Sequence, residues 1–502
     1  MQSFPHSRGR VLAVALATAV IGTAAAPAAQ AAVSVPSGVP SARKAAERSV
    51  QHEDFNGDGV RDTAVAAPYA TVDGVRGAGL VTVVYGSGTA KPSEREKQVI
   101  HRNTPGVAGD ATAHATFGHA LTTGDLDGDG FADLVVNGAV TGSPEEGKGI
   151  LTVIWGSRDG LTGASTLLRS TDQQFGGSGL VNAGDINGDG HQDLVAADGH
   201  SLRVLPGPFR RDGSSPGPEQ AFDQVHAVDV AVGDLNGDGY ADVAVAQEEY
   251  DSPWLFPSTW VRFGGPKGLT DTATALRRDI SGISLDIGDI NGDGFAELVT
   301  GDPVDRRNPQ DEVVIELGGR ISVIPGSARG LLVDQAASYT QDSPGIPGTR
   351  GDSGSFGATS DRFGASVTVG RLDADGYADL VVGVPGKDIG AHKDTGTVVL
   401  LRGGPRGFNA PDARVIDQNT TGVPGTVEAQ DVFGSTTRVV DLSGDGRAEL
   451  MVSAPGEDDS AGAVWTLRGS AAGPLPHDSV SFKAGEVAPG SGKAMLGRVI
   501  AD

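Results

Sequence analysis

A nine-residue acidic pattern, DxNxDGxxD, recurs along the 502-residue chain and constrains its fold more than any other feature. Its seven copies begin at Asp54, Asp125, Asp185, Asp234, Asp289, Arg371 and Asp441. Successive copies start 71, 60, 49, 55, 82 and 70 residues apart, which leaves room for four short strands and their connections. The sequence therefore predicts seven copies of one structural unit.

The residues around each copy predict strands in a constant order. A Phe-Gly step lies eight positions before three of the copies, at Phe117, Phe363 and Phe433, and leads into an alternating run. A short apolar run follows the copy, then a strand that ends in a Gly turn, then a weaker and more polar strand. Four-stranded units bury their faces against one another when they form a ring. We therefore expect an all-β fold, a seven-bladed β-propeller of four-stranded blades.

The two ends of the repeat region predict how this ring closes. The first copy, at Asp54, has no Phe-Gly step before it. The last residues, 496–500, form a first-strand pattern that begins with Leu496-Gly497 and has no acidic copy after it. We expect this C-terminal strand to complete the first blade.

The N-terminus predicts export. Arg8 and Arg10 precede an apolar run over residues 11–26, and small residues follow up to Ala31. We interpret residues 1–31 as a signal peptide, 32–48 as a flexible lead-in and 49–502 as the propeller. An uncleaved signal anchor is the alternative; no other segment is long and apolar enough to cross a membrane. The expected location is extracellular, and the absence of Cys excludes disulfides as a source of stability.

The acidic copies are candidate metal sites. Positions one, three, five and nine offer side-chain oxygens, and position seven offers its backbone carbonyl; such all-oxygen sets favour Ca²⁺. Ordinary Asp-Gly and Asn-Gly turns are the alternative, but they do not explain three or four carboxylates within nine residues. The expected ligands are Asp54, Asn56, Asp58, Val60, Asp62, Asp125, Asp127, Asp129, Phe131, Asp133, Asp185, Asn187, Asp189, His191, Asp193, Asp234, Asn236, Asp238, Tyr240, Asp242, Asp289, Asn291, Asp293, Phe295, Glu297, Asp373, Asp375, Asp379, Asp441, Ser443, Asp445, Arg447 and Glu449.

Two copies depart from the pattern. In the sixth, Arg371 stands at position one, and we expect its guanidinium to lie where the ion otherwise would and to pair with the remaining carboxylates. That site is predicted to be weak or empty. In the seventh, Ser443 and Glu449 replace the usual residues at positions three and nine. The sequence therefore predicts five or six calcium ions.

With the Phe-Gly step, the acidic copy and a trailing Gly-Ala-Pro-like step in place, residues 49–502 resemble the FG-GAP repeat family, the propeller type of the integrin α N-terminus. The resemblance implies that the acidic loops bind calcium on one face and that loops of the opposite face hold ligands. No integrin-like second domain follows, so a freestanding, secreted bacterial relative is the better comparison.

The expected function is that of a binding or adhesion scaffold. Asp and Glu outnumber Lys and Arg by 64 to 39, a net charge of -25 that disfavours nucleic acid. We expect a monomer whose ligand is a protein or a glycan at the cell surface or cell wall. A lectin, with Trp254 and Trp260 as sugar-stacking candidates, is one alternative. A hydrolase related to glycosylphosphatidylinositol phospholipase D is another, although HExxH is absent. Arg350-Gly351-Asp352 matches an adhesion tripeptide that chance readily produces.

Overall fold

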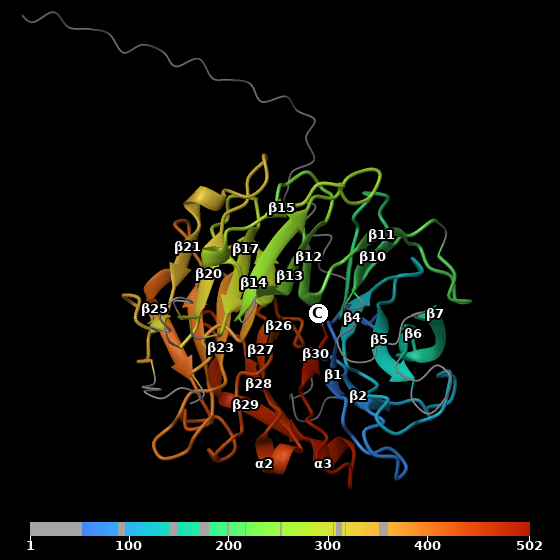
Figure 1. The fold of residues 1–502 in the computed structure, drawn as a ribbon. Coiled ribbons are helices and arrows are strands. Elements are labelled where there is room, and N and C mark those ends of the chain that lie inside the picture. The colour runs from blue at the N-terminus through green and yellow to red at the C-terminus, as the bar shows by residue number, and fades with distance from the viewer. Residues whose placement is uncertain are drawn as a thin grey trace, which may run out of the picture. The chain divides into compact units, whose positions relative to one another are not determined.

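Seven four-stranded antiparallel sheets make up the computed structural model of this protein (Figure 1). It describes residues 53–88, 96–140, 148–169, 180–197, 200–215, 217–251, 254–304, 306–307, 314–316, 318–350 and 360–501. The predicted signal peptide and lead-in lie outside these residues. The seven-bladed all-β propeller expected from the repeats is confirmed.

The first four blades span the N-terminal half. Blade one contains β1 (Thr63–Ala67), β2 (Leu80–Val84), β3 (Lys97–Ile100) and β30 (Val499–Ile500). Blade two contains β4 (Leu121–Gly124), β5 (Asp133–Val140), β6 (Lys148–Trp155) and β7 (Thr162–Arg169). Blade three contains β8 (Leu180–Gly184), β9 (Asp193–Ala197), β10 (Ser201–Leu205) and β11 (Gln220–Asp223). Blade four contains β12 (Ala227–Gly233), β13 (Asp242–Asp251), β14 (Trp254–Arg262) and β15 (Thr274–Ala275).

The last three blades follow in the same order. Blade five contains β16 (Ser284–Gly288), β17 (Glu297–Asp302), β20 (Arg320–Ile324) and β21 (Ala337–Tyr339), with a hairpin of β18 (Arg306–Arg307) and β19 (Val314–Glu316). Blade six contains β22 (Ser366–Gly370), β23 (Asp379–Val384), β24 (Thr397–Arg402) and β25 (Asn409–Ile416). Blade seven contains β26 (Thr437–Val440), β27 (Glu449–Ala454), β28 (Ala463–Arg468) and β29 (Leu475–Lys483). The described helices are short: η3 (Arg278–Ile280), η4 (Val333–Gln335), α2 (Glu457–Ser460) and α3 (Ala484–Val487). None of them is long and apolar enough to cross a membrane.

The hydrophobic core lies between the blades. Each of the seven clusters of buried apolar side chains combines residues of two neighbouring blades. In one cluster Phe117 of blade two packs with Val81 and Val83 of blade one. Strands such as β1 and β9 are buried along their whole length because neighbours cover both faces. The stability of each blade therefore depends on the blades beside it.

Glycines let the innermost strands approach one another closely. A Cβ added at Gly184 would lie 2.4 Å from Val232 of the next blade, and one at Gly370 would lie 2.6 Å from Val439. Since real Cβ atoms do not come this close to neighbouring atoms, these positions require Gly. This close approach explains why Gly recurs directly before the acidic loops.

The C-terminus closes the ring, as the sequence predicts. Strand β30 pairs with β1, with Val499 opposite Ala66 and Ile500 opposite Val65. Figure 1 shows these two strands side by side. Residues of blade seven and blade one share a core cluster, in which Met451 and Leu80 both take part. The first and last segments of the propeller are thus packed together.

Candidate metal-binding loops

In blades two to seven the acidic loop joins the two inner strands, and in blade one it leads into β1. In blade two, residues 125–132 connect β4 to β5, with Gly124 paired opposite Asp133. The apolar residue at position two anchors each loop to the blade. These seven side chains are at most 1% exposed: Phe55, Leu126, Ile186, Leu235, Ile290, Leu372 and Leu442.

The position-one carboxylate organises the turn. Asp125 accepts backbone N–H groups from Gly128 at 2.9 Å, Asp129 at 3.1 Å and Gly130 at 3.0 Å. Gly128 and Gly130 have φ values of 75° and 92°, a left-handed conformation that glycine adopts without strain. The loops that begin at Asp54, Asp185, Asp234 and Asp289 repeat the bonds to positions four and six. The motif thus folds the chain around its first carboxylate.

Positions three, five and seven add a second layer of contacts. In the first loop Asn56 accepts the N–H of Asp58 at 2.9 Å, and Asp58 accepts that of Val60 at 2.8 Å. The N–H of position seven is bonded to the position-five carboxylate in the same way at Phe131, His191, Tyr240, Phe295, Tyr377 and Arg447. Asn at position three also donates to a carboxylate, as Asn236 does to Asp238 at 2.9 Å.

The position-nine carboxylates are deeply buried in every loop. All seven are at most 3% exposed: Asp62, Asp133, Asp193, Asp242, Glu297, Asp379 and Glu449. Each accepts the N–H of the position-two residue at 2.8–3.1 Å. Where position nine is Asp, the other oxygen accepts the N–H of a Gly after the third strand; Asp62 bonds Gly86 at 2.8 Å. These bonds fix the carboxylates in place without neutralising their charge.

Burial shifts the pKa of these groups. Desolvation raises the pKa of Asp62 and Asp133 to about 8, and neighbouring loop carboxylates add to the effect. The same cause raises the pKa of Asp242 and Glu297 to about 7 and that of Asp193 and Asp379 to about 6. The backbone N–H donors lower these pKa values but do not offset burial. A buried carboxylate in this state is stabilised by a cation or by a proton.

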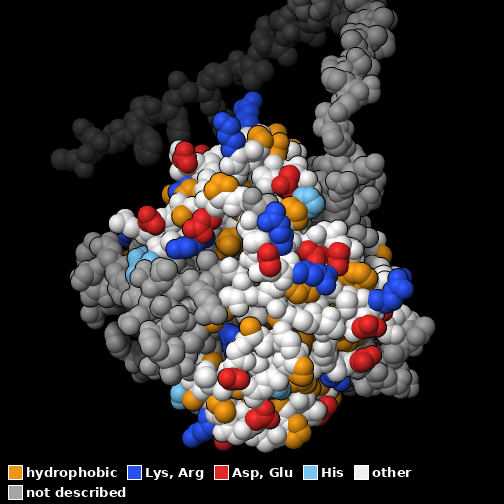
Figure 2. All heavy atoms as spheres, turned by 90° about the vertical axis from the view of Figure 1, so that its right-hand side faces the viewer, with side chains coloured by type: hydrophobic (Ala, Val, Ile, Leu, Met, Phe, Trp, Pro, Cys, Tyr) orange, Lys and Arg blue, Asp and Glu red, His pale blue; other side chains and the backbone are white. Residues whose placement is uncertain are grey.

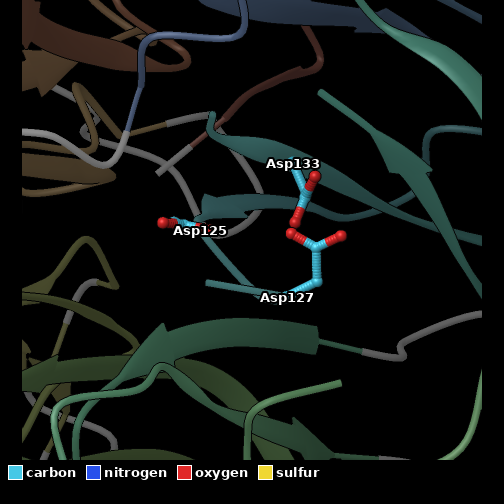
Figure 3. Close-up of side chains that lie close together, drawn as sticks. All are labelled: Asp125, Asp127 and Asp133. Carbon is cyan, nitrogen blue, oxygen red and sulfur yellow. The ribbon is translucent and has the colours of Figure 1, made fainter. Parts of the chain in front are cut away.

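The second loop shows how the oxygens could surround an ion. Oxygens of Asp125, Asp127 and Asp133 lie within 4.8 Å of one another (Figure 3). Calcium binds oxygen at about 2.3–2.6 Å, so two ligands on opposite sides of it are about 5 Å apart. The three carboxylates therefore fit around one calcium ion. Since the ligands are hard oxygens and several are carboxylates, zinc and copper fit less well.

An arginine from the next blade contacts this loop. Arg211 donates to Asp127 at 2.7 Å and to Asp129 at 2.6 Å, and its guanidinium lies 5.6 Å from the ring centroid of Trp155. The second loop has Asp at position three where four other loops have Asn. Arg211 thus balances one additional carboxylate. The sequence pattern gave no signal for it, because Arg211 is 84 residues from Asp127.

The sixth loop departs from the expectation for Arg371. That side chain is exposed, and it is a guanidinium from strand β24, that of Arg402, that forms ion pairs with Asp373 and Asp375. An arginine does pair with these carboxylates, as predicted, but it is Arg402 and not Arg371. The physical reason is reach: Arg371 begins the loop and points to solvent, whereas Arg402 comes from a strand inside the blade.

The seventh loop keeps its first carboxylate. Asp441 accepts the N–H of Gly446 at 2.8 Å, and Ser443 donates to Asp441 at 3.2 Å. Arg468, which precedes the third-strand Gly just as Arg402 does, lies 3.5 Å from Asp445. The loop thus has the common backbone turn together with a nearby, more exposed arginine.

The sequence also suggested candidates outside the acidic loops, the sugar-stacking Trp residues and the Arg-Gly-Asp tripeptide. Trp260 belongs to strand β14 and is 9% exposed, in a core cluster. It is thus no open sugar platform; the side chain of Trp254 lies outside the described part of the chain. Trp155 and Trp465 are buried as well. Of the Arg350-Gly351-Asp352 tripeptide only Arg350 is described, and its guanidinium lies 3.3 Å from Asp342.

Comparison with known families supports this reading. The FG-GAP repeat model matches residues 117–151, 363–401 and 433–467, and the FG-GAP-like repeat model matches 185–245 and 234–300. The fold and its loops define a β-propeller with one acidic loop per blade. The repeats of this chain match FG-GAP repeat models, and segments of the chain are similar to integrin α proteins.

Curated relatives share only part of their length with this chain. A 207-residue segment is 28% identical to integrin alpha-5 of Xenopus laevis and covers 40% of this chain and 16% of that protein. A 118-residue segment is 34% identical to phosphatidylinositol-glycan-specific phospholipase D of Bos taurus and covers 23% of this chain and 14% of that protein. The matches thus span less than a fifth of either relative.

The fold of this chain superposes only weakly on solved structures. The exotype rhamnogalacturonan lyase YesX gives a TM-score of 0.40 at 14% identity, over 85% of this chain and 72% of that one. Aleuria aurantia lectin gives a TM-score of 0.35 at 10% identity, over 69% of this chain and 90% of that one. Both TM-scores are too low to bear on function.

Proposed function

We propose that this protein is a secreted β-propeller whose acidic loops bind calcium and whose opposite face binds a protein ligand. The observation that carries the calcium part is the burial of a carboxylate at position nine of every loop. Burying so many ionised groups without cations would destabilise the fold. Each ion would join the first, third, fifth and ninth positions of its loop and, where the loop connects two inner strands, would hold these strands together.

Calcium would act on stability. Extracellular oxygen sites of this kind bind calcium at roughly 0.1–1 mM, so each occupied loop would add about 1 kcal/mol to the free energy of unfolding at millimolar calcium. Several loops would together decide whether the propeller stays folded at moderate temperature. Export to a calcium-rich medium, which the N-terminal residues predict, supports this role.

The calcium part is tested by titration of the purified protein after exhaustive chelation. Calorimetry and elemental analysis should find several calcium ions per chain, and the melting temperature should rise with calcium. Magnesium at the same concentration should raise it less, because it demands a stricter octahedral geometry. A protein that binds no calcium and melts identically with and without chelator would refute the proposal.

A hollow on the face opposite the loops is the candidate ligand site. It encloses about 520 Å³ and is lined by Tyr69, Ser460, Lys493, Met495 and Arg498. The first loop ends where β1 begins, whereas Tyr69 follows the other end of β1, which places the hollow away from the loops. The N–H of Met495 donates to Ser460 at 3.0 Å, and that of Tyr69 to Ala494 at 3.4 Å. The hollow therefore lies where blades seven and one meet.

The lining favours an acidic peptide. Tyr69 is 40% exposed, and Arg498 is exposed with no ion pair among the described residues. Lys493 is paired with Asp459 at 3.1 Å, but both side chains are largely exposed. An aromatic ring beside two cations suits a carboxylate with an apolar neighbour. Among the described residues on the side of the molecule shown in Figure 2, acidic and basic side chains are interspersed.

An array of acidic peptides tests the ligand part. Peptides with Asp or Glu beside an aromatic residue should bind, and the variant Lys493→Glu/Arg498→Glu should lose that binding. Arg329→Glu, at an exposed arginine in the turn after β20, is the matched control and should bind normally. Equal binding by all three proteins would exclude the hollow as the ligand site.

A further inference from the structure

The sixth loop differs from the other six in sequence at two positions. Arg371 stands at position one instead of a carboxylate, and Ala374 stands at position four instead of Gly. The loop still carries three carboxylates, Asp373, Asp375 and Asp379. Its sequence alone therefore leaves open whether it binds an ion.

The backbone of this loop also differs. The other six loops have a Gly at position four with φ between 65° and 75°: Gly57, Gly128, Gly188, Gly237, Gly292 and Gly444. Ala374 does not have a positive φ. With no carboxylate at position one, the N–H groups of positions four to six also lack the acceptor that Asp125 provides in the second loop. The turn is thus not wrapped around a central carboxylate.

In the sixth loop a guanidinium contacts the acidic side chains in place of the missing position-one carboxylate. Arg402 contacts the carboxylate of Asp373 through Nη2, and the same nitrogen lies 3.6 Å from Oδ2 of Asp375. The Asp373 side chain is 1% exposed, whereas position three is only partly buried in the first three loops. Arg402 itself is 21% exposed. The ion pair therefore lies largely inside the blade, where screening by water is weak.

The seventh loop shows that an arginine at this place is not sufficient. Arg468 is 52% exposed and lies 3.5 Å from Asp445, yet Asp441 is retained and Gly444 has a φ of 65°. The common turn persists there. What sets the sixth loop apart is the combination of a buried ion pair with the loss of the position-one carboxylate.

We propose that the sixth loop takes no calcium and is held closed by Arg402. In one of the seven blades, the loop between the inner strands would then not depend on calcium. This rests on the proposed calcium binding by the other loops. In those loops a divalent ion neutralises the carboxylates; in the sixth, a residue of the same blade does so permanently. Removal of calcium would then loosen six loops and leave this one closed.

Four variants test the proposal by calcium count and by melting temperature in excess chelator. Arg371→Asp alone should bind as many ions as the wild type, because Arg402 still occupies the loop. The triple variant Arg371→Asp/Ala374→Gly/Arg402→Met, which restores the common motif, should bind one ion more. Arg402→Met should melt about 5 °C lower in chelator, and calcium should not restore the loss. Arg406→Met, at an exposed arginine just after β24, is the control and should melt like the wild type.

The outcomes separate this proposal from that of calcium binding in general. An additional ion bound by Arg371→Asp alone would overturn it, as would an unchanged melting temperature of Arg402→Met in chelator. If the wild type bound no calcium at all, the proposed function would fail, but the comparison of Arg402→Met with Arg406→Met would still test the ion pair. If the triple variant did not fold, the two single variants would decide the matter.

Discussion

The backbone N–H of Gly497 donates to the carbonyl of Ala66 at 2.9 Å, which ties the last strand to the first blade. The same bond occurs within other blades, where Gly118 donates to Asn137 and Gly434 to Ser453, each at 2.9 Å. In every case the acceptor lies four residues after position nine of a loop. The C-terminal Leu496-Gly497 thus takes the structural place of the Phe-Gly step that the first repeat lacks.

Replacement of Gly497 should therefore open the ring. In Gly497→Ala the new Cβ would lie 2.6 Å from Ser453 and 2.8 Å from Val464, at a φ of 86° that alanine rarely adopts. We expect a loss of about 2–4 kcal/mol in the free energy of unfolding, measured by urea denaturation. Truncation after Met495 should cost more.

Gly485→Ala is the matched control, since nothing lies within 4 Å of its added Cβ. It should unfold at the same urea concentration as the wild type or a higher one. If Gly497→Ala and the truncated protein behaved like this control, ring closure would contribute nothing to stability.

Substitution at position nine should remove the benefit of calcium. Asp242→Asn keeps the size of the side chain but not its charge, so the fourth loop should lose its ion. In millimolar calcium the variant should melt lower than the wild type; in chelator the difference should shrink, because neither protein then has an ion in that loop. Asp271→Asn, at an exposed carboxylate, should show no calcium-dependent difference. A deficit of equal size in both conditions would mean that Asp242 acts only through its hydrogen bonds.

Removal of Arg211 should strengthen calcium binding by the second loop. Arg211→Gln leaves four carboxylates without their guanidinium, so calcium affinity there should rise a few-fold, while the melting temperature in chelator should fall. A higher calcium affinity together with a lower melting temperature in chelator would show that Arg211 competes with calcium as a cation and is not only a structural contact. Arg210→Gln is a neighbouring control. Lower stability both with and without calcium would instead assign Arg211 a packing role against Trp155.

A buried carboxyl away from the loops should make stability depend on pH. Desolvation raises the pKa of Asp431 to about 6; Glu457 and Glu428 raise it further, while hydrogen bonds from the Glu428 N–H and from Gln418 oppose them. Lys483, which pairs with Glu457 at 2.9 Å, is the nearby cation. Because the folded pKa lies above the unfolded value, the folded state binds the proton more tightly between about pH 4 and 6.

Asp431 should therefore lower the stability as the pH rises through this window. Asp431→Asn, which still accepts the Glu428 N–H, should remove that contribution and be more stable than the wild type at pH 7 by about 1–3 kcal/mol. Urea unfolding at pH 4, 5, 6 and 7 measures it. A constant difference between the two proteins across this range would show that Asp431 does not titrate there.

Much of the fold was predictable because its signals are local and repeated. The spacing of the acidic copies predicted one four-stranded unit for each copy, and the structure has seven four-stranded blades. The Leu496-Gly497 step predicted ring closure without any knowledge of its partner Ala66. Trp260 was a candidate for sugar stacking, but it lies in strand β14, paired with β13, and is buried in a core cluster. The burial of Trp260 comes from packing with residues of the neighbouring blade, such as Leu202, and no local pattern records such packing.

The sequence by itself determined the number of blades, the acidic loops and the strand that closes the ring, because each of these depends on residue types at fixed short spacings. Only the tertiary structure decided which cations meet the loop carboxylates. Arg211 reaches Asp127 across a blade boundary, and Arg402 reaches Asp373 across a strand pair. Such contacts arise from the packing of distant segments, and a guanidinium on a long side chain can approach from any of several neighbours.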